Sequence, residues 1–94
     1  MNPAKKQLKL LLRQNGIHYY LFNDGLATKH QGPVPVLSFR FDADGYIIVT
    51  HVARSQKLMI RTGSINVLLE KMVLHKFLAP ATLLTLLKSD EQRT

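Results

Sequence analysis

The hydrophobic and polar pattern is clearest between Val36 and Ala53, where it predicts a β-hairpin. Asp42-Ala43-Asp44-Gly45 suits a type I turn followed by a glycine in the left-handed region. Side chains alternate between the two faces of a strand, so this turn fixes which residues face each other. The predicted core face pairs Leu37 with His51, Phe39 with Val49 and Phe41 with Ile47. The second face is mixed and carries Val36, Ser38, Arg40, Asp42, Tyr46, Ile48, Thr50 and Val52.

An amphipathic helix is predicted near the start of the chain. Asn2 suits the N-cap and Pro3 the first helical position, and Asn15-Gly16 is a typical stop after about Gln14. At 100° per residue one stripe is apolar, formed by Ala4, Leu8, Leu11 and Leu12. The adjacent arc is cationic and has no acid to offset it, with Lys5, Lys6, Lys9 and Arg13. This arc is a candidate for phosphate contacts, and a solvated face is an equally good interpretation.

Two strands are predicted between this helix and the hairpin. Residues 17–22 are rich in aromatic and branched side chains, and because both faces are largely apolar we expect a central or doubly covered position. Asn23-Asp24-Gly25 indicates a turn, after which residues 26–31 return as a short second strand. The prolines of Gly32-Pro33-Val34-Pro35 then favour an extended loop.

Residues 54–63 fit two patterns. Lys57, Met59 and Arg61 alternate with apolar positions, as in an edge strand. The same residues also fit a short helix ended by Gly63. In that interpretation residues 55–72 would form a helix-turn-helix, although Thr62 and Ser64 fit its turn poorly.

The last third of the chain predicts two apolar helices. Ser64 caps the first, which runs to about Leu78, and Pro80 separates it from a second over residues 81–88. Residues 89–94 should form a frayed tail. These helices exceed what one small sheet covers, so one interpretation is a homodimer through their exposed faces and the other is a compact monomer. The dimer would use Leu68, Met72, Leu83, Leu84 and Leu87.

Together these elements predict one α+β domain over residues 1–94: an N-terminal helix, a three- to four-stranded antiparallel meander, and two C-terminal helices packed on one face. Apolar residues make up 46% of the 94-residue chain, which indicates a globular protein. The absence of cysteine excludes disulfides and thiolate metal sites. No apolar run reaches the length of a membrane span, so we expect no membrane contact and a cytoplasmic protein.

The formal charge of +7 favours polyanionic partners. Three of the six acids, Asp24, Asp42 and Asp44, lie in predicted turns, which leaves the cations with few local partners. The leading functional prediction is therefore a small nucleic-acid-binding domain with RNA slightly preferred. Its predicted contact residues are Lys5, Lys6, Lys9, Arg13, Arg40, Tyr46, Arg54, Lys57 and Arg61. A protein-interaction module built on the Leu-rich helices is the alternative.

Enzymatic chemistry has little support in the residues. The glycine-rich phosphate motifs and the nucleophile motif Gly-x-Ser-x-Gly are absent, and we expect no cofactor. One pairing across the first turn places His18 opposite His30, but two imidazoles without a carboxylate do not make a zinc site. RNA cleavage is the one reaction that a basic, acid-poor surface suits, and His30 next to Lys29 is the best placed base for it.

Residues 11–74 resemble the HicA toxins, small double-stranded-RNA-binding-like proteins that cleave mRNA. The similar segments are Leu11-Leu12-Arg13-Gln14-Asn15-Gly16, Phe39-Arg40-Phe41-Asp42-Ala43-Asp44-Gly45, Ile48-Val49-Thr50-His51-Val52 and Thr62-Gly63-Ser64-Ile65-Asn66-Val67-Leu68-Leu69-Glu70-Lys71. The resemblance implies a helix, three strands and a helix, with a ribonuclease activity. It places His30 in the region of the family's catalytic Gly-Ser-His motif, which is itself absent here.

Overall fold

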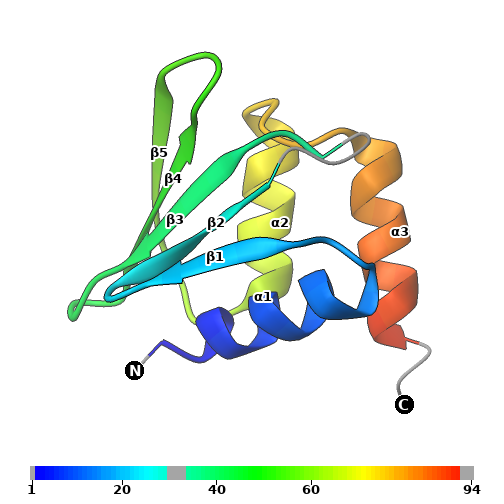
Figure 1. The fold of residues 1–94 in the computed structure, drawn as a ribbon, viewed down its shortest axis with the longest axis horizontal. Coiled ribbons are helices and arrows are strands. Elements are labelled where there is room, and N and C mark those ends of the chain that lie inside the picture. Colours follow the sequence, from blue (N-terminus) through cyan, green and yellow to red (C-terminus); the bar gives the residue numbers. More distant parts are fainter. Residues whose placement is uncertain (1, 30–33, 92–94) are drawn as a thin grey trace.

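A computed structural model describes residues 2–29 and 34–91, with side chains up to residue 86. In chain order its elements are α1 (Pro3–Gln14), β1 (Tyr19–Phe22), β2 (Gly25–Thr28), β3 (Leu37–Phe41), β4 (Tyr46–His51), β5 (Gln56–Arg61), α2 (Ile65–Leu74) and α3 (Pro80–Glu91). Figure 1 shows a sheet with the helices gathered on one side of it. The predicted α+β class is confirmed.

The sheet is an antiparallel meander in which each strand pairs with its neighbours along the chain, in the order β1-β2-β3-β4-β5. It has five strands rather than the three or four that the sequence predicts. The ambiguous segment 54–63 contains the fifth, because Gln56–Arg61 pairs along its whole length with β4. The helix-turn-helix prediction is therefore wrong.

The hairpin register is confirmed: all three predicted core pairs, Leu37 with His51, Phe39 with Val49 and Phe41 with Ile47, are present. Gly45 has a φ of +90°, as the predicted turn requires. The Asp42 carboxylate accepts hydrogen bonds from the backbone N–H groups of Asp44 (2.9 Å) and Tyr46 (3.1 Å). The sequence therefore specifies both the turn and the two faces of this hairpin.

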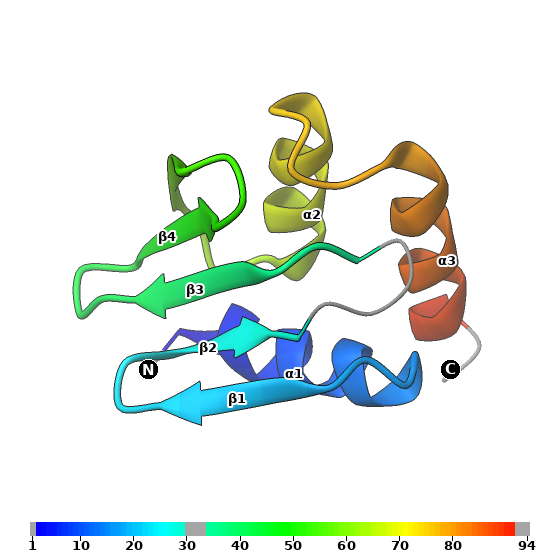
Figure 2. The same ribbon diagram turned by 45° about the horizontal axis from the view of Figure 1, so that its top comes forward.

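The core lies between the helices and one face of the sheet. Phe39, Ile47 and Val49 point into it and are buried, as is the predicted apolar stripe of α1. α2 packs against α1 and β5, and α3 packs against both α1 and α2 (Figure 2). Leu68 and Met72, which were predicted to face a second subunit, are buried in this core.

The helix ends follow the prediction for α1 and depart from it for the other two. Asn2 caps α1, with its side chain accepting a hydrogen bond from Ala4 N–H, and Ser64 caps α2 as expected. However, α2 ends at Leu74 rather than Leu78, because the chain turns into the left-handed region at Lys76. α3 runs to Glu91, so residues 89–91 are helical rather than frayed, and the rest of the predicted tail lies outside the described residues.

β1 lies at an edge of the sheet, not at the predicted central position. Tyr20 and Leu21 are 58% and 59% exposed, although they point to opposite faces. Their apolar character therefore does not reflect burial. None of the described helices is long and apolar enough to cross a membrane.

Candidate nucleic-acid interface

The face of the sheet opposite the helices is open and carries aromatic and cationic side chains. The strand registers place Tyr20 and Phe22 of β1 on this face, followed by Arg40 of β3, Tyr46 of β4 and alternate residues of β5. The β5 residues are Lys57, Met59 and Arg61. None of the five strands contains an acidic residue.

Two of the aromatic rings on this face lie beside a cation. The Lys29 ammonium is 4.5 Å from the centroid of the Tyr20 ring, and the Arg61 guanidinium is 5.6 Å from that of Tyr46. Each pair combines two features. A base can stack on the flat ring, and a phosphate can approach the positive charge beside it. The two pairs come from four different strands or strand ends, so the face is built by the sheet as a whole.

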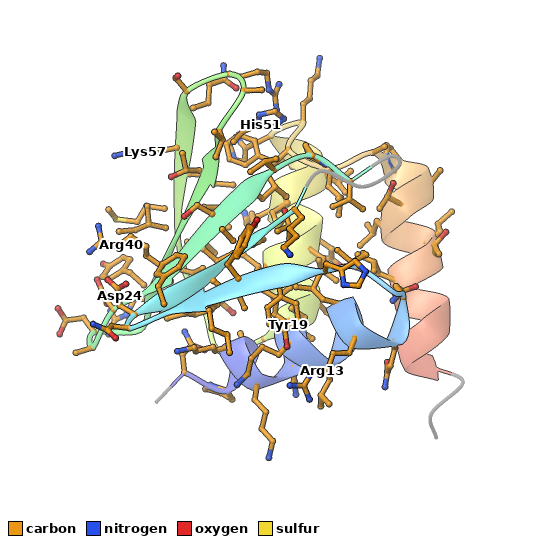
Figure 3. The ribbon with its side chains drawn as sticks, viewed as in Figure 1. Arg13, Tyr19, Asp24, Arg40, His51 and Lys57 are labelled. Atoms are coloured by element: carbon orange, nitrogen blue, oxygen red, sulfur yellow. The ribbon has the colours of Figure 1, made fainter. Side chains whose placement is uncertain are left out.

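Asp24 lies in the turn between β1 and β2, and it is held by Arg40. The Arg40 Nη2 lies 2.9 Å from the Asp24 Oδ2, and the Nε donates to the same oxygen at 3.0 Å. Figure 3 shows both residues at the end of the sheet near the first turn, with Lys57 further along and also pointing away from the helices. Arg40 thus partly neutralises Asp24, whereas Asp42, which pairs with Tyr46 at the end of the hairpin, is a second acid that borders the open face.

The predicted contact residues separate into three groups. Arg40, Tyr46, Lys57 and Arg61 share the open face. The cationic arc of α1 belongs to the helical layer, where the Arg13 Nε donates to the Tyr19 hydroxyl at 3.0 Å (Figure 3). The predicted arc therefore belongs to a different layer from the cations of the sheet, although Lys5 at its start and Arg61 of β5 line the same cleft.

Arg54 forms the third group, at the turn between β4 and β5. Its guanidinium donates to the backbone carbonyl of Lys76 and lies 5.5 Å from the centroid of the Phe77 ring. The Phe77 ring also meets the His51 ring edge-on at 5.8 Å, and the His51 Nδ1 accepts from the Arg54 backbone N–H at 3.4 Å. These contacts assign Arg54 and His51 to the junction between the hairpin and the end of α2.

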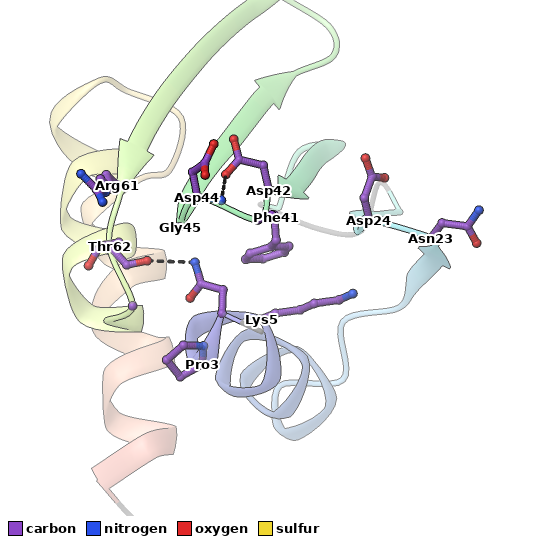
Figure 4. Close-up of a pocket in the computed structure, with 13 residues that line it drawn as sticks. Pro3, Lys5, Asn23, Asp24, Phe41, Asp42, Asp44, Gly45, Arg61 and Thr62 are labelled. Atoms are coloured by element: carbon purple, nitrogen blue, oxygen red, sulfur yellow. Dashed lines mark hydrogen bonds between the residues drawn. The ribbon is translucent and has the colours of Figure 1, made fainter.

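A cleft of about 810 Å³ lies at the opposite end of the strands, between α1 and the first two sheet turns (Figure 4). Lys5 and Arg61 line it together with the three turn acids Asp24, Asp42 and Asp44. Its mixed charge does not suit a polyanion. Among the described residues no cluster of three or more histidines or acids is arranged to hold a metal ion.

The structure tests the prediction for His18 but not the one for His30. The register of β1 and β2 places His18 opposite Lys29 rather than His30, and Lys29 N–H donates to the His18 carbonyl at 3.0 Å. The predicted His18–His30 pairing is therefore wrong by one residue. His30, the candidate base of the ribonuclease interpretation, lies outside the described residues.

Sequence reasoning missed Tyr20, Phe22 and Lys29 as surface residues. The two aromatic residues were interpreted as core because their strand is apolar on both faces. No local signal marks a strand as an edge, since that depends on where the other strands pair. The absence of any charged residue in 19–22 is consistent with either position.

Of the residues predicted for a helical dimer interface, Leu83 is partly buried and Leu84 is 60% exposed. The side chain of Leu87 lies outside the described ones. Comparison with protein-family models, curated proteins and solved structures finds no match for this chain.

Proposed function

We propose that the protein binds single-stranded nucleic acid, preferentially RNA, on the open face of its sheet. The observation that carries this proposal is an uncovered five-stranded surface with exposed aromatic rings, cations beside them and no acid in any strand. Bases of a single strand are free to stack on such rings, whereas the bases of a duplex are already stacked on one another.

The expected roles follow from chemistry and position. Tyr20, Phe22 and Tyr46 stack on bases. The cations contact phosphates, and they are Lys29, Arg40, Lys57 and Arg61. Five strands spaced about 4.8 Å apart make a platform about 19 Å wide, which suits a short stretch of extended single strand.

Fluorescence anisotropy with an RNA oligonucleotide of about eight nucleotides, titrated at several salt concentrations, tests the proposal. Each phosphate contact on a single strand contributes about −0.7 to the slope of log affinity against log salt, so four cations predict a slope near −3. A duplex of the same sequence should bind more weakly. A flat slope, or no binding at low salt, would overturn the proposal and favour a protein-interaction module.

Three single variants locate the site. Tyr20→Ala should weaken binding by about 1–3 kcal/mol, which is roughly 5- to 150-fold, through lost stacking. Lys57→Ala should make the salt slope shallower by about 0.7. Lys71→Ala is the matched control, since it removes the same charge from an exposed position on α2.

The α1 arc needs its own variant because the sequence also predicts it as a candidate for phosphate contacts. Lys6→Ala removes an exposed cation from the middle of that arc. If Lys6→Ala changes the slope while Lys57→Ala does not, the arc is the binding surface and the open face is not.

A further inference from the structure

The two edges of the sheet are protected very differently. β5 presents Gln56, Lys57 and Arg61, which are charged or polar and exposed, as is usual for an edge that must not pair with another chain. β1 has no charged residue, and the exposed side chains on both of its faces are apolar or aromatic. Such an edge is suited to accept a further strand.

Backbone groups on the outer side of β1 are in position for this. His18 and Lys29 form a hydrogen-bonded pair across β1 and β2. In an antiparallel ladder such pairs alternate with pairs whose N–H and C=O groups point away from each other. The backbone groups of Tyr19 and Leu21 therefore point outward, and none of the other described strands pairs with that side.

We propose that β1 pairs antiparallel with β1 of a second copy of this chain, which joins two five-stranded sheets edge to edge about a two-fold axis. In such a pair the facing residues must lie on the same side of the sheet. Centring the axis at Leu21 meets this condition. It places Leu21 opposite the second copy's Leu21, and Tyr20 opposite the second copy's Phe22 on the open face, twice over. This proposal stands independently of nucleic-acid binding.

Charge complementarity favours a second copy over an unrelated peptide. The same register places His18 at the start of each strand opposite Asp24 at the end of the other, at the end of the strand where Arg13 contacts Tyr19, so the Asp24 carboxylate, already paired with Arg40 of its own subunit, meets a second group of nitrogen donors. A hollow of about 500 Å³ lined by Arg13, Ile17, Tyr19 and Leu21 gives the incoming side chains room on the helix side of the edge. The residues that face each other across the axis are thus complementary in charge, and the edge leaves room for a second copy.

Sedimentation equilibrium tests the proposal over ~10 µM to ~1 mM, the range in which so small an interface associates. The mass should rise from 10.7 kDa toward twice that value. Leu21→Pro removes the outward N–H without adding charge, and an edge strand tolerates proline at such a position, so this variant should stay monomeric. Circular dichroism checks that it folds.

Met59→Pro is the matched control on the other edge. Met59 is 63% exposed, against 59% for Leu21. Its N–H also points outward, because Asp42 N–H donates to the Tyr46 carbonyl and the alternation continues into β5. This variant should dimerise like the natural chain. A natural chain that stays monomeric throughout the range, or a Leu21→Pro variant that dimerises equally well, overturns the proposal.

Cysteine cross-linking tests the register. The chain has no cysteine, so Leu21→Cys introduces one thiol per subunit. A hydrogen-bonded antiparallel pair has its Cα atoms about 5.5 Å apart, within reach of a disulfide. Under a mild oxidant Leu21→Cys should form covalent dimers faster than Tyr20→Cys, and Met59→Cys should form few. Equal rates for all three variants contradict the register.

The salt dependence distinguishes self-association from nucleic-acid binding, because the two should respond to salt in opposite directions. The net charge of +7 on each copy outweighs the single charge pairing at each end of the interface, so the two copies repel each other and self-association should strengthen as salt screens that repulsion. Nucleic-acid binding should weaken over the same range. Leu21 lies on the face opposite the RNA platform, so Leu21→Pro leaves the proposed contact residues in place.

Discussion

At the scale of single residues, two helices of this protein end in the same motif with different residues. After α1, Gly16 N–H donates to the Arg13 carbonyl and Ile17 N–H to the Leu12 carbonyl, and Gly16 has a φ of +67°. After α2, Lys76 N–H donates to the Val73 carbonyl and Phe77 N–H to the Met72 carbonyl. Both are Schellman motifs, but at the second a lysine occupies the position that favours glycine, with a φ of +63°.

Lys76→Gly should therefore stabilise the protein. Relief of the left-handed strain outweighs the extra freedom of glycine in the unfolded chain, for a net gain of about 0.5–1 kcal/mol. Urea denaturation measures this as a higher midpoint at constant slope. Lys76→Ala removes the same charge but keeps the Cβ, so it should show no comparable gain; an equal gain there would mean that charge rather than backbone strain is responsible.

At the scale of elements, a buried threonine joins β2 to the start of β3. The Thr28 hydroxyl donates to the Pro35 carbonyl at 2.8 Å and accepts from Leu37 N–H at 2.9 Å. Thr28 is one of the few buried polar residues among those described. Its side chain thus replaces a ladder hydrogen bond where the chain enters the hairpin.

Thr28→Val keeps the shape and removes both hydrogen bonds, which leaves a buried N–H without a partner. We expect a loss of about 1–3 kcal/mol in the free energy of unfolding. Thr28→Ser keeps the hydroxyl and loses one methyl group, at a cost of about 1 kcal/mol. If packing alone mattered the order would reverse, with Val neutral and Ser costly, so urea denaturation of the two variants decides between the explanations.

The elements also show how much of the fold is predictable from the sequence. The hairpin is predictable to the residue because Asp42-Ala43-Asp44-Gly45 sets the turn and alternation sets the faces. Asn2 and Ser64 are predictable as caps from their own chemistry. The end of α2 is not predictable in this way, because the left-handed position after it is occupied by Lys76 and not by the glycine that usually marks the end of a helix.

The candidate site was predictable only in part. Arg40, Tyr46, Lys57 and Arg61 follow from alternation once β4 and β5 are known to pair. Tyr20, Phe22 and Lys29 depend on β1 being an edge, which only the whole sheet decides. The cationic arc of α1 was predicted correctly as a feature of the helix, yet its position relative to the sheet cations depends on tertiary packing.

At the scale of the whole molecule, three acids gather at one end of the strands. Asp24, Asp42 and Asp44 all lie in the turns that line one cleft. Arg54 and Lys76 meet at the other end, through the contact of Arg54 with the Lys76 carbonyl. The open face between these ends has cations and aromatic rings, and Arg40 and Arg61 lie where this face meets the acidic turns, so a bound strand would run across the sheet toward its edges.

Edge-to-edge pairing through β1 would place two such faces side by side, and this links the two proposals in one prediction. An RNA of about sixteen nucleotides should bind the natural chain at least tenfold more tightly than one of about eight, because the second platform acts at high effective concentration. In Leu21→Pro the longer RNA should gain only about twofold, from the larger number of places to bind, while the shorter RNA binds both proteins alike. Anisotropy titrations at protein concentrations where the natural chain is dimeric measure all four affinities. If the gain with length is the same in both proteins, the two faces do not act as one surface, even if each binds RNA and the chains do associate.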